Sequence, residues 1–257
     1  MIRKIQREKG LFFSYDYNLT KSAQTNINEI VDRKAFTGFW EELTKEFVFN
    51  SNFIKFSSDV NALKDYLIPV VYGNIFIRVC EKESKKMNYA LISRKDCRRL
   101  GKRFTCRGAT EDGSVVNYVE TEQIMSDYDG QNYRVAAYLQ TRGSIPIKWT
   151  QTPTLKWAPK LKMSPDDETN FKFLKTHLDR EVEKYGENVL VNLIDKKGSQ
   201  LQIGTKFTDM VNRYKNPKIT YEWFDFHHEC RKMRWENLKI LIDKIKDKMN
   251  SFDYFMA

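Results

Sequence analysis

A helix pattern followed directly by a buried-strand pattern is the feature that most constrains how this chain can fold. Residues 164–167, Ser-Pro-Asp-Asp, predict a helix start with Ser164 as the N-cap, proline in the first turn and acids at the positive end of the helix dipole. Apolar residues then recur at helical spacing as far as Gly186, a typical helix end. Residues 189–194 are almost all apolar, as in a strand covered on both faces. Together the two patterns predict an α/β layer.

Alternating apolar residues predict further strands on both sides of this pair. The strands are expected over residues 74–79, 87–92, 115–119, 133–139 and 219–226. Shorter helices are expected over residues 21–28, after an N-cap at Thr20, and over residues 207–214. A last helix is expected to carry these apolar residues toward the core: Met233, Leu238, Leu241, Ile242, Ile245 and Met249. Because Phe252, Tyr254 and Met256 alternate, the chain is expected to end on a strand. The predicted fold class is α/β, a mixed sheet with flanking helices.

Basic residues gather between two of the predicted strands: Arg94, Lys95, Arg98, Arg99, Lys102, Arg103 and Arg107. Their field suits phosphate or another polyanion. A solvated charged hairpin is the alternative, and charge alone favours it. The net charge of +10 also suggests an anionic partner, namely a membrane surface, nucleic acid or a phosphorylated ligand. Nucleic acid is not indicated, since the sequence has no zinc spacing, basic leucine zipper or recognisable RNP box.

The composition is that of a globular protein. The 257 residues are 41% hydrophobic and 30% charged, which allows one large domain or two small ones with their own cores. The four cysteines fit neither a zinc site nor a disulfide framework, which indicates reduced thiols in a cytosolic compartment. The N-terminus has no hydrophobic signal core, and no apolar run is long enough to span a bilayer. Any membrane contact is therefore expected to be peripheral or to lie outside this sequence.

Several sequence blocks carry a family resemblance. In the basic segment they are Ile-Ser-Arg-Lys at 92–95, Asp-Gly at 112–113 and Asn-Tyr-Val-Glu-Thr-Glu-Gln at 117–123. They continue with Arg-Gly-Ser-Ile-Pro at 142–146, Trp-Thr-Gln at 149–151, and residues 192–198 and 225–236. In order and spacing these blocks resemble the Sac domain of phosphoinositide phosphatases, most closely the form anchored on the endoplasmic reticulum. The likeness covers about residues 11–256; Thr150 stands where the family has Ser, which keeps the hydroxyl.

The resemblance implies two incomplete parts. Residues 1–65 would be part of the Sac N-terminal subdomain, and residues 66–257 an incomplete Sac catalytic subdomain. The family removes a monophosphate from phosphoinositides, here most closely phosphatidylinositol 4-phosphate, on the cytosolic face of the endoplasmic reticulum or Golgi. The implied partners are phosphoinositide headgroups and an anionic membrane surface. The family mechanism runs through a cysteine-phosphate intermediate and requires no metal or other cofactor.

The family's Cys-x5-Arg loop follows the strand at which this sequence stops, so the resemblance implies a chain truncated at both ends and inactive alone. Cys97 and Arg103 match the pattern, but we do not expect them to be catalytic, because Phe104 stands where Ser or Thr usually follows the Arg. Nearby cations would nevertheless lower the pKa of that thiol. The alternative hypothesis is a non-catalytic protein that binds phosphoinositides or membranes on the same scaffold.

The resemblance implies four substrate-binding residues: Arg142, Lys197, Asp225 and His227. Arg142 could hold phosphate through two hydrogen bonds, or pair with a carboxylate under the sheet. Asp225, His227 and Glu229 alternate along a predicted strand end, where Asp225 or His227 could orient substrate or a loop. A structural His227 is the alternative, and general experience with histidines favours it. A metal at His227, His228 and Glu229 would lack an evident fourth ligand.

Two further expectations concern single side chains. His177 lies on the predicted helix and is expected to face solvent. The pairs Lys148-Trp149 and Lys156-Trp157 interleave a cation with an aromatic ring, so they could touch lipid headgroups or form core edges.

Overall fold

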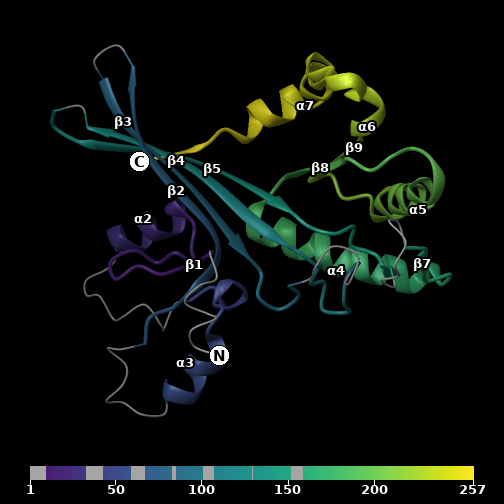
Figure 1. The fold of residues 1–257 in the computed structure, drawn as a ribbon, viewed down its shortest axis with the longest axis horizontal. Helices are drawn as coiled ribbons and strands as arrows, with labels where there is room; N and C mark the ends of the chain where they lie inside the picture. Colours follow the sequence, from purple (N-terminus) through teal and green to yellow (C-terminus); the bar gives the residue numbers. More distant parts are fainter. Residues whose placement is uncertain are drawn as a thin grey trace. The chain divides into compact units, whose positions relative to one another are not determined.

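The computed structural model of the protein describes residues 10–32, 43–58, 67–82, 85–100, 107–128, 130–151 and 159–257 (Figure 1). The chain forms two compact units. The first unit comprises Met1–Leu100, Asn117–Arg142 and Tyr254–Ala257; the second comprises Gly101–Val116 and Gly143–Asp253. The subdomain boundary expected near residue 65 falls outside the described residues and stays a prediction.

An antiparallel sheet of six strands forms the first unit, in the order β1-β2-β3-β4-β5-β10. The strands are β1 (Leu11–Phe12), β2 (Val71–Lys82), β3 (Lys85–Lys95), β4 (Val119–Tyr128), β5 (Tyr133–Arg142) and β10 (Phe255–Met256). The four central strands are the long blue and teal arrows of Figure 1. In β10, Phe255 lies opposite Ala137, so the predicted C-terminal strand is confirmed.

Short helices accompany this sheet: α2 (Ala23–Asp32), η2 (Lys45–Phe47) and α3 (Ser51–Ser58). One core cluster contains Leu19, Val71 and Ile92. The N-cap predicted at Thr20 is wrong. The helix begins later, where Ser22 Oγ accepts a hydrogen bond from the Thr25 amide at 3.2 Å, while the Thr20 hydroxyl donates to Asn18 Oδ1 at 2.6 Å.

The second unit packs two long helices beside two small sheets. Its elements are β6 (Trp149–Gln151), β7 (Leu161–Met163), α4 (Asp167–Tyr185), β8 (Asn188–Asn192), α5 (Gly198–Tyr214) and β9 (Ile219–Trp223). β6 and β7 pair antiparallel, whereas β8 and β9 pair parallel. The core consists of Ile147, Leu174, Leu178, Ile203, Phe207, Met210 and Val211. The α/β fold class is thus confirmed, with the parallel pairing among the described strands confined to β8 and β9.

The helix predicted over residues 164–186 forms, but its start differs. Asp166 is the N-cap of α4, because its carboxylate accepts from the amides of Glu168 at 3.2 Å and Thr169 at 3.3 Å. Ser164 instead accepts from the Asp166 amide at 3.3 Å. Pro165 therefore precedes the cap. The predicted stop is confirmed, since Gly186 has φ of 76° at the C-cap.

Other boundaries also move. β4 begins only at Val119, because Val115 forms an isolated bridge with Ala109 across a turn. The strand predicted over residues 219–226 ends at Trp223, and the helix predicted from residue 207 begins at Gly198. Among the described residues, no helix is both long and apolar enough to cross a membrane.

The end of the second unit contradicts the predicted buried helix. It contains α6 (Phe226–Glu229), η4 (Arg231–Met233), η5 (Trp235–Asn237) and α7 (Leu238–Phe252). No residue of α7 is buried, and Ile242 is 56% exposed. Met233 lies before the helix rather than on its inner face. Of the apolar residues predicted to face the core, Leu241, Ile245 and Met249 of α7 are half-buried, whereas Ile242 is exposed.

Candidate functional site

The parallel strands β8 and β9 end side by side in the second unit. Asn192 and Trp223 are register partners, and the Phe224 amide donates to the Asn192 carbonyl at 2.9 Å. The residues that follow, 195–198 after β8 and 225–229 after β9, therefore lie near each other. In α/β layers, ligands bind outside the carboxyl ends of parallel strands. We call these two segments the loop cluster.

Asp225 joins the two halves of the loop cluster. Its Oδ2 accepts from the Lys196 amide at 2.8 Å, and its Oδ1 accepts from the His228 amide at 3.0 Å. Burial of this carboxylate disfavours its charge, but the two amides and the nearby His228 and Lys197 outweigh that effect. The pKa of Asp225 is therefore lowered from its usual value. Asp225 is an ionised residue that holds the loop after β8.

His227 lies at the rim of the cluster. Its side chain is 71% exposed, and its Nδ1 lies 2.7 Å from Asp195 Oδ1. Asp195 is in turn held by Gln200, whose Oε1 accepts from the Asp195 amide at 3.1 Å. The carboxylate orients the imidazole, so that its other ring nitrogen is directed away from this pair.

The cluster contains two exposed lysines, Lys196 and Lys197, beside three acids: Asp195, Asp225 and Glu229. Lys196 places its Nζ 5.5 Å from the centroid of the Trp223 ring, and the Trp223 indole donates to the Ile194 carbonyl at 2.9 Å. Lys197 is the N-cap of α5 without a side-chain capping bond, and Gly198 follows with φ of 58°. Lys197 therefore stands at the positive end of the α5 dipole, a position that favours an anion.

The structure gathers three of the four predicted substrate-binding residues in the loop cluster: Lys197, Asp225 and His227. Arg142 belongs to the first unit, where it is exposed at the end of β5 opposite Val119.

The strand predicted at residues 225–229 is wrong. Asp225 caps the short helix α6, so His227, His228 and Glu229 occupy successive helical positions instead of alternating along a strand. The chain leaves the ladder at Asp225, whose carboxylate binds two amides at the start of α6. Within the described part of the chain, no group of three or more His, Cys, Asp or Glu side chains is arranged to hold a metal.

The basic segment does not present its first cation to a ligand. Arg94 is 0% exposed: its Nε lies 2.8 Å from Glu120 Oε1, its Nη2 contacts Glu122, and its Nη1 donates to the Leu19 carbonyl at 2.9 Å. Both sequence-based alternatives, phosphate binding and a solvated hairpin, are therefore wrong for Arg94. Arg98 pairs with Asp96. Lys102 and Arg103 lie outside the described residues.

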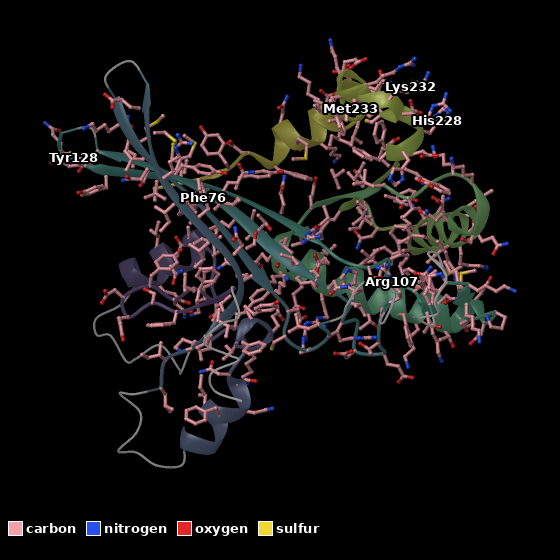
Figure 2. The ribbon with its side chains drawn as sticks, in the orientation of Figure 1. Phe76, Arg107, Tyr128, His228, Lys232 and Met233 are labelled. Atoms are coloured by element: carbon pink, nitrogen blue, oxygen red, sulfur yellow. The ribbon has the colours of Figure 1, made fainter. Side chains whose placement is uncertain are left out.

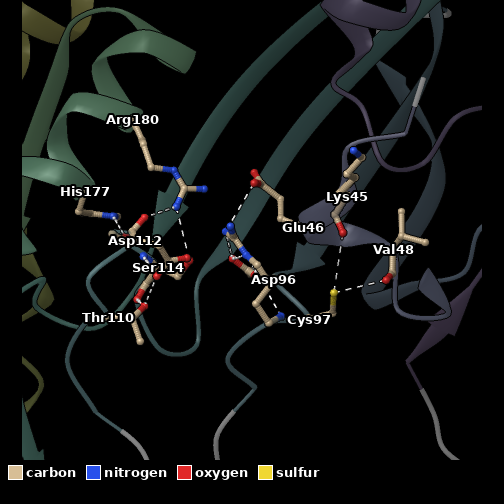
Figure 3. A network of polar contacts seen from close by, with 12 residues as sticks. Lys45, Glu46, Val48, Asp96, Cys97, Thr110, Asp112, Ser114, His177 and Arg180 are labelled. Atoms are coloured by element: carbon tan, nitrogen blue, oxygen red, sulfur yellow. Dashed lines mark hydrogen bonds and ion pairs between the residues drawn. The ribbon is translucent and has the colours of Figure 1, made fainter. Parts of the chain in front are cut away.

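Cys97 lacks the environment of a nucleophile. Its Sγ donates to the Val48 carbonyl at 3.3 Å and lies 3.9 Å from the Lys45 carbonyl (Figure 3). Burial, followed by the charge of Asp96, raises the pKa of the thiol, although the sequence predicted a lowered value. Arg98 opposes this shift more weakly. The expectation that Cys97 is not catalytic agrees with this raised pKa.

A second network lies on α4, in the second unit (Figure 3). Arg180 donates to the Asp112 carbonyl at 2.9 Å, and His177 Nδ1 lies 3.0 Å from the Gly113 carbonyl. A Cβ on Gly113 would stand 2.9 Å from the His177 backbone nitrogen, so glycine permits this close approach. Burial lowers the pKa of His177 to about 4. The predicted solvent-facing His177 is wrong.

The Trp149 side chain is a core edge rather than a lipid contact. It packs against the core of the second unit, and its indole donates to the Ile145 carbonyl at 3.0 Å. The guanidinium of Arg107 lies 5.7 Å from the ring centroid. Trp157 lies outside the described residues.

Sequence reasoning missed two residues of the loop cluster, Asp195 and Lys196. Asp195 orients His227, and the Lys196 amide is the group that Asp225 binds. The only signal in the sequence was their position inside the block 192–198. Their roles depend on the parallel register of β8 and β9, which no local pattern encodes.

With this fold and loop cluster, the comparisons define the class of protein. The chain belongs to the SacI homology domain family, whose model matches residues 1–231. It is 36% identical to the Danio rerio phosphatidylinositol-3-phosphatase SAC1-A over 257 residues, covering 100% of this chain and 43% of the relative.

Two further relatives come from other kingdoms. The Saccharomyces cerevisiae phosphatidylinositol-3-phosphatase SAC1 is 34% identical, covering 97% of this chain and 40% of the relative. The Arabidopsis thaliana phosphoinositide phosphatase SAC6 is 31% identical, covering 98% and 41%. The chain thus spans about two-fifths of the length of the curated relatives that it matches.

Proposed function

We propose that this chain serves phosphoinositide phosphatase chemistry, the removal of a monophosphate from phosphatidylinositol phosphates. Membership of the SacI homology domain family over residues 1–231 is the observation that carries the proposal. Relatives from fish, yeast and plant that match nearly the whole chain are named as phosphatases of this lipid class. Phosphoinositide headgroups are accordingly the proposed ligands.

The loop cluster is the proposed headgroup contact in the second unit. Lys197 supplies a cation beside the N-terminus of α5, which suits a phosphate group. Asp225 acts on the loop rather than on the lipid, because both of its oxygens accept backbone amides. His227, oriented by Asp195, presents its second ring nitrogen at the rim. Arg142, exposed in the first unit, is proposed separately as a phosphate ligand because guanidinium binds phosphate in a bidentate manner.

The 257 residues by themselves are proposed to bind the lipid without hydrolysing it. The chemistry requires the cysteine of a Cys-x5-Arg loop to be a thiolate. In this sequence only Cys97 matches that pattern. The raised pKa of Cys97 disfavours the thiolate. Hydrolysis through a cysteine-phosphate intermediate, without a metal, is proposed for a protein in which the family's catalytic loop is present.

The finer assignment is phosphatidylinositol 4-phosphate on the cytosolic face of endoplasmic reticulum or Golgi membranes. It rests on the likeness to the form anchored on the endoplasmic reticulum. Two of the relatives are named for the 3-phosphate, so both isomers belong in the test.

The experiment measures phosphate release and vesicle binding by the purified 257-residue chain in parallel. Vesicles contain phosphatidylinositol 4-phosphate, the 3-phosphate isomer, or phosphatidylserine at matched charge. We expect binding that prefers a phosphoinositide, with no phosphate release. Lys197→Gln should weaken this preference, whereas Lys218→Gln, an exposed lysine elsewhere in the second unit, should not.

Two results would count against the proposal. Phosphate release that disappears in Cys97→Ser would make this chain an enzyme in its own right. Equal binding to all three kinds of vesicle, unchanged by Lys197→Gln, would contradict headgroup binding at the loop cluster.

The second candidate function is a non-catalytic lipid-binding protein on the same scaffold. The raised pKa of Cys97 favours it, since no nucleophile is then supplied by the matching pattern. Intact mass of the protein isolated from its own cells distinguishes the two. A mass near 30.6 kDa favours the binding protein, whereas peptides that continue into a Cys-x5-Arg loop favour the phosphatase.

A further inference from the structure

The turn between α6 and α7 exposes large apolar side chains. Residues 231–236 are all exposed, with Met233 at 77% and Trp235 at 53% (Figure 2). Figure 2 shows Met233 and Lys232 on the outer side of this turn. The turn thus exposes two large apolar side chains two positions apart.

The backbone of this turn is held in a strained form. Lys232 has φ of 60° and Met233 has φ of 59°, although neither is glycine and two such residues rarely follow each other. Cys230 is buried at the start of the turn. At its end, Asn237 Nδ2 donates to the Glu229 carbonyl at 2.6 Å. Strain that the surrounding structure maintains is typical of functional segments.

Cations flank both apolar side chains. The order is Arg231, Lys232, Met233, Arg234, Trp235, with Glu236 as the acid that follows. The Trp235 ring lies 6.1 Å from that of Phe226, which supports its base while its outer part remains exposed. Trp and Met among Arg and Lys suit the boundary between headgroups and acyl chains of an anionic bilayer.

We propose that the Arg231–Trp235 turn docks on the surface of an anionic lipid bilayer. Met233 and Trp235 enter the headgroup–acyl boundary, and Arg231, Lys232 and Arg234 contact lipid phosphates. The inference deepens the proposed function by naming its membrane-contact surface. It requires no phosphoinositide, because the cations recognise any anionic headgroup.

Charge decides between a membrane and a second copy of the chain. A two-fold dimer on this turn would place the same patch on both partners. Three cations of each copy would then face each other, which is unfavourable without anions between them. An anionic bilayer supplies the opposite charge and an apolar phase together.

The test measures partitioning of the 257-residue chain onto vesicles of phosphatidylcholine with about 30% phosphatidylserine and no phosphoinositide. We expect salt-sensitive binding. Met233→Ser/Trp235→Ser keeps the charge and should weaken partitioning by about tenfold or more. Arg231→Gln/Lys232→Gln/Arg234→Gln keeps the apolar pair and should weaken it by a similar factor or more.

Matched controls distinguish the contribution of this turn from the effects of net charge and of exposed aromatic side chains in general. Lys162→Gln/Lys172→Gln/Lys218→Gln removes three exposed cations elsewhere in the second unit. Tyr128→Ser/Tyr133→Ser removes two exposed aromatic rings of the first unit. Both controls should change partitioning by less than about twofold. Circular dichroism and unfolding midpoints establish that every variant is folded.

A depth measurement completes the test. Brominated lipids should quench tryptophan fluorescence of the wild type, and Trp235→Phe should remove that quenching while partitioning persists. Three outcomes would overturn the proposal: no binding to the phosphatidylserine vesicles, equal losses in the turn variants and their controls, or a wild-type dimer that Met233→Ser/Trp235→Ser dissociates. Loss of the headgroup preference, or phosphate release by this chain, would leave these readouts unaffected, so the two proposals fail separately.

Discussion

Arg94 shows that a cation predicted to lie at the surface can instead be buried in an ion pair. In sequence it opens a run of cations, but in the structure it is enclosed by Glu120 and Glu122 and by the carbonyl of Leu19. Glu122 Oε1 also accepts the Ala23 amide at 2.7 Å, at the start of α2. Arg94 thereby fastens the segment before α2 to the sheet.

Replacement of Arg94 should be costly because it leaves two buried carboxylates without a counter-ion. We expect Arg94→Met to lower the free energy of unfolding by about 3–5 kcal/mol. Urea unfolding of the full chain measures the change. Adding Glu120→Gln and Glu122→Gln to Arg94→Met should restore part of the loss. A loss below about 1 kcal/mol would show that the network contributes little.

His177 should make stability depend on pH. Its pKa is about 4 in the folded chain against 6.5 when unconstrained, chiefly through burial, with Arg180 acting in the same direction. Above pH 6.5 it is neutral in both states. As pH falls toward 4 the unfolded chain takes up the proton first, so stability declines by at most about 3 kcal/mol and then levels off.

A comparison with His177→Asn isolates this effect. Asparagine retains a donor toward the Gly113 carbonyl but does not titrate. The difference in unfolding free energy between the two proteins should change between pH 6.5 and 4 and stay constant above that window. A difference that is flat throughout would contradict a neutral buried His177.

At the scale of elements, the loop cluster depends on Asp225, which caps α6 and binds the loop after β8. Asp225→Ala should remove the acceptor for the Lys196 and His228 amides and destabilise the second unit by about 1–2 kcal/mol. Amide hydrogen exchange should accelerate at those two positions before others. Because the folded pKa of Asp225 is lowered, this contribution exists above pH 3.8 and is lost as pH falls through the folded value. Unchanged exchange at Lys196 would contradict the assigned role.

Periodicity was sufficient for the long elements. Strands β2, β3 and β5 and helix α4 lie where alternation and helical spacing predicted them. The ends of elements were less predictable, because several side chains near a helix start can accept from the first amides. In α4, Asp166 is the N-cap and not the predicted Ser164. The short helix α6 was missed, since Asp225 caps it at the His228 amide while also binding the distant Lys196 amide.

The candidate site was predictable only in part. Family blocks in the sequence led to Lys197, Asp225 and His227, and the parallel register of β8 and β9 brings them together. Asp195 acts by orienting His227, and Lys196 acts through its backbone amide, which Asp225 binds. Residue type alone does not reveal either role. The exposed turn at Met233 contradicted helical spacing, because two left-handed residues redirect the chain before α7 begins.

For the whole molecule, membership of the SacI homology domain family and the net charge of +10 point in the same direction. Both favour an anionic lipid surface carrying phosphorylated headgroups. Burial raises the pKa of Cys97, the thiol that matches Cys-x5-Arg. These residues are proposed to recognise the lipid, and hydrolysis is proposed only where the family's catalytic loop is present.

Titration of the isotope-labelled chain with the soluble headgroup inositol 1,4-bisphosphate tests this account most directly. We predict saturable shifts at the amides of Lys196, Lys197 and Gly198 and at the His227 ring, greatly reduced in Lys197→Gln and not reproduced by sulfate at equal charge. Shifts confined to other residues, or equal responses to sulfate, would contradict headgroup recognition by the loop cluster.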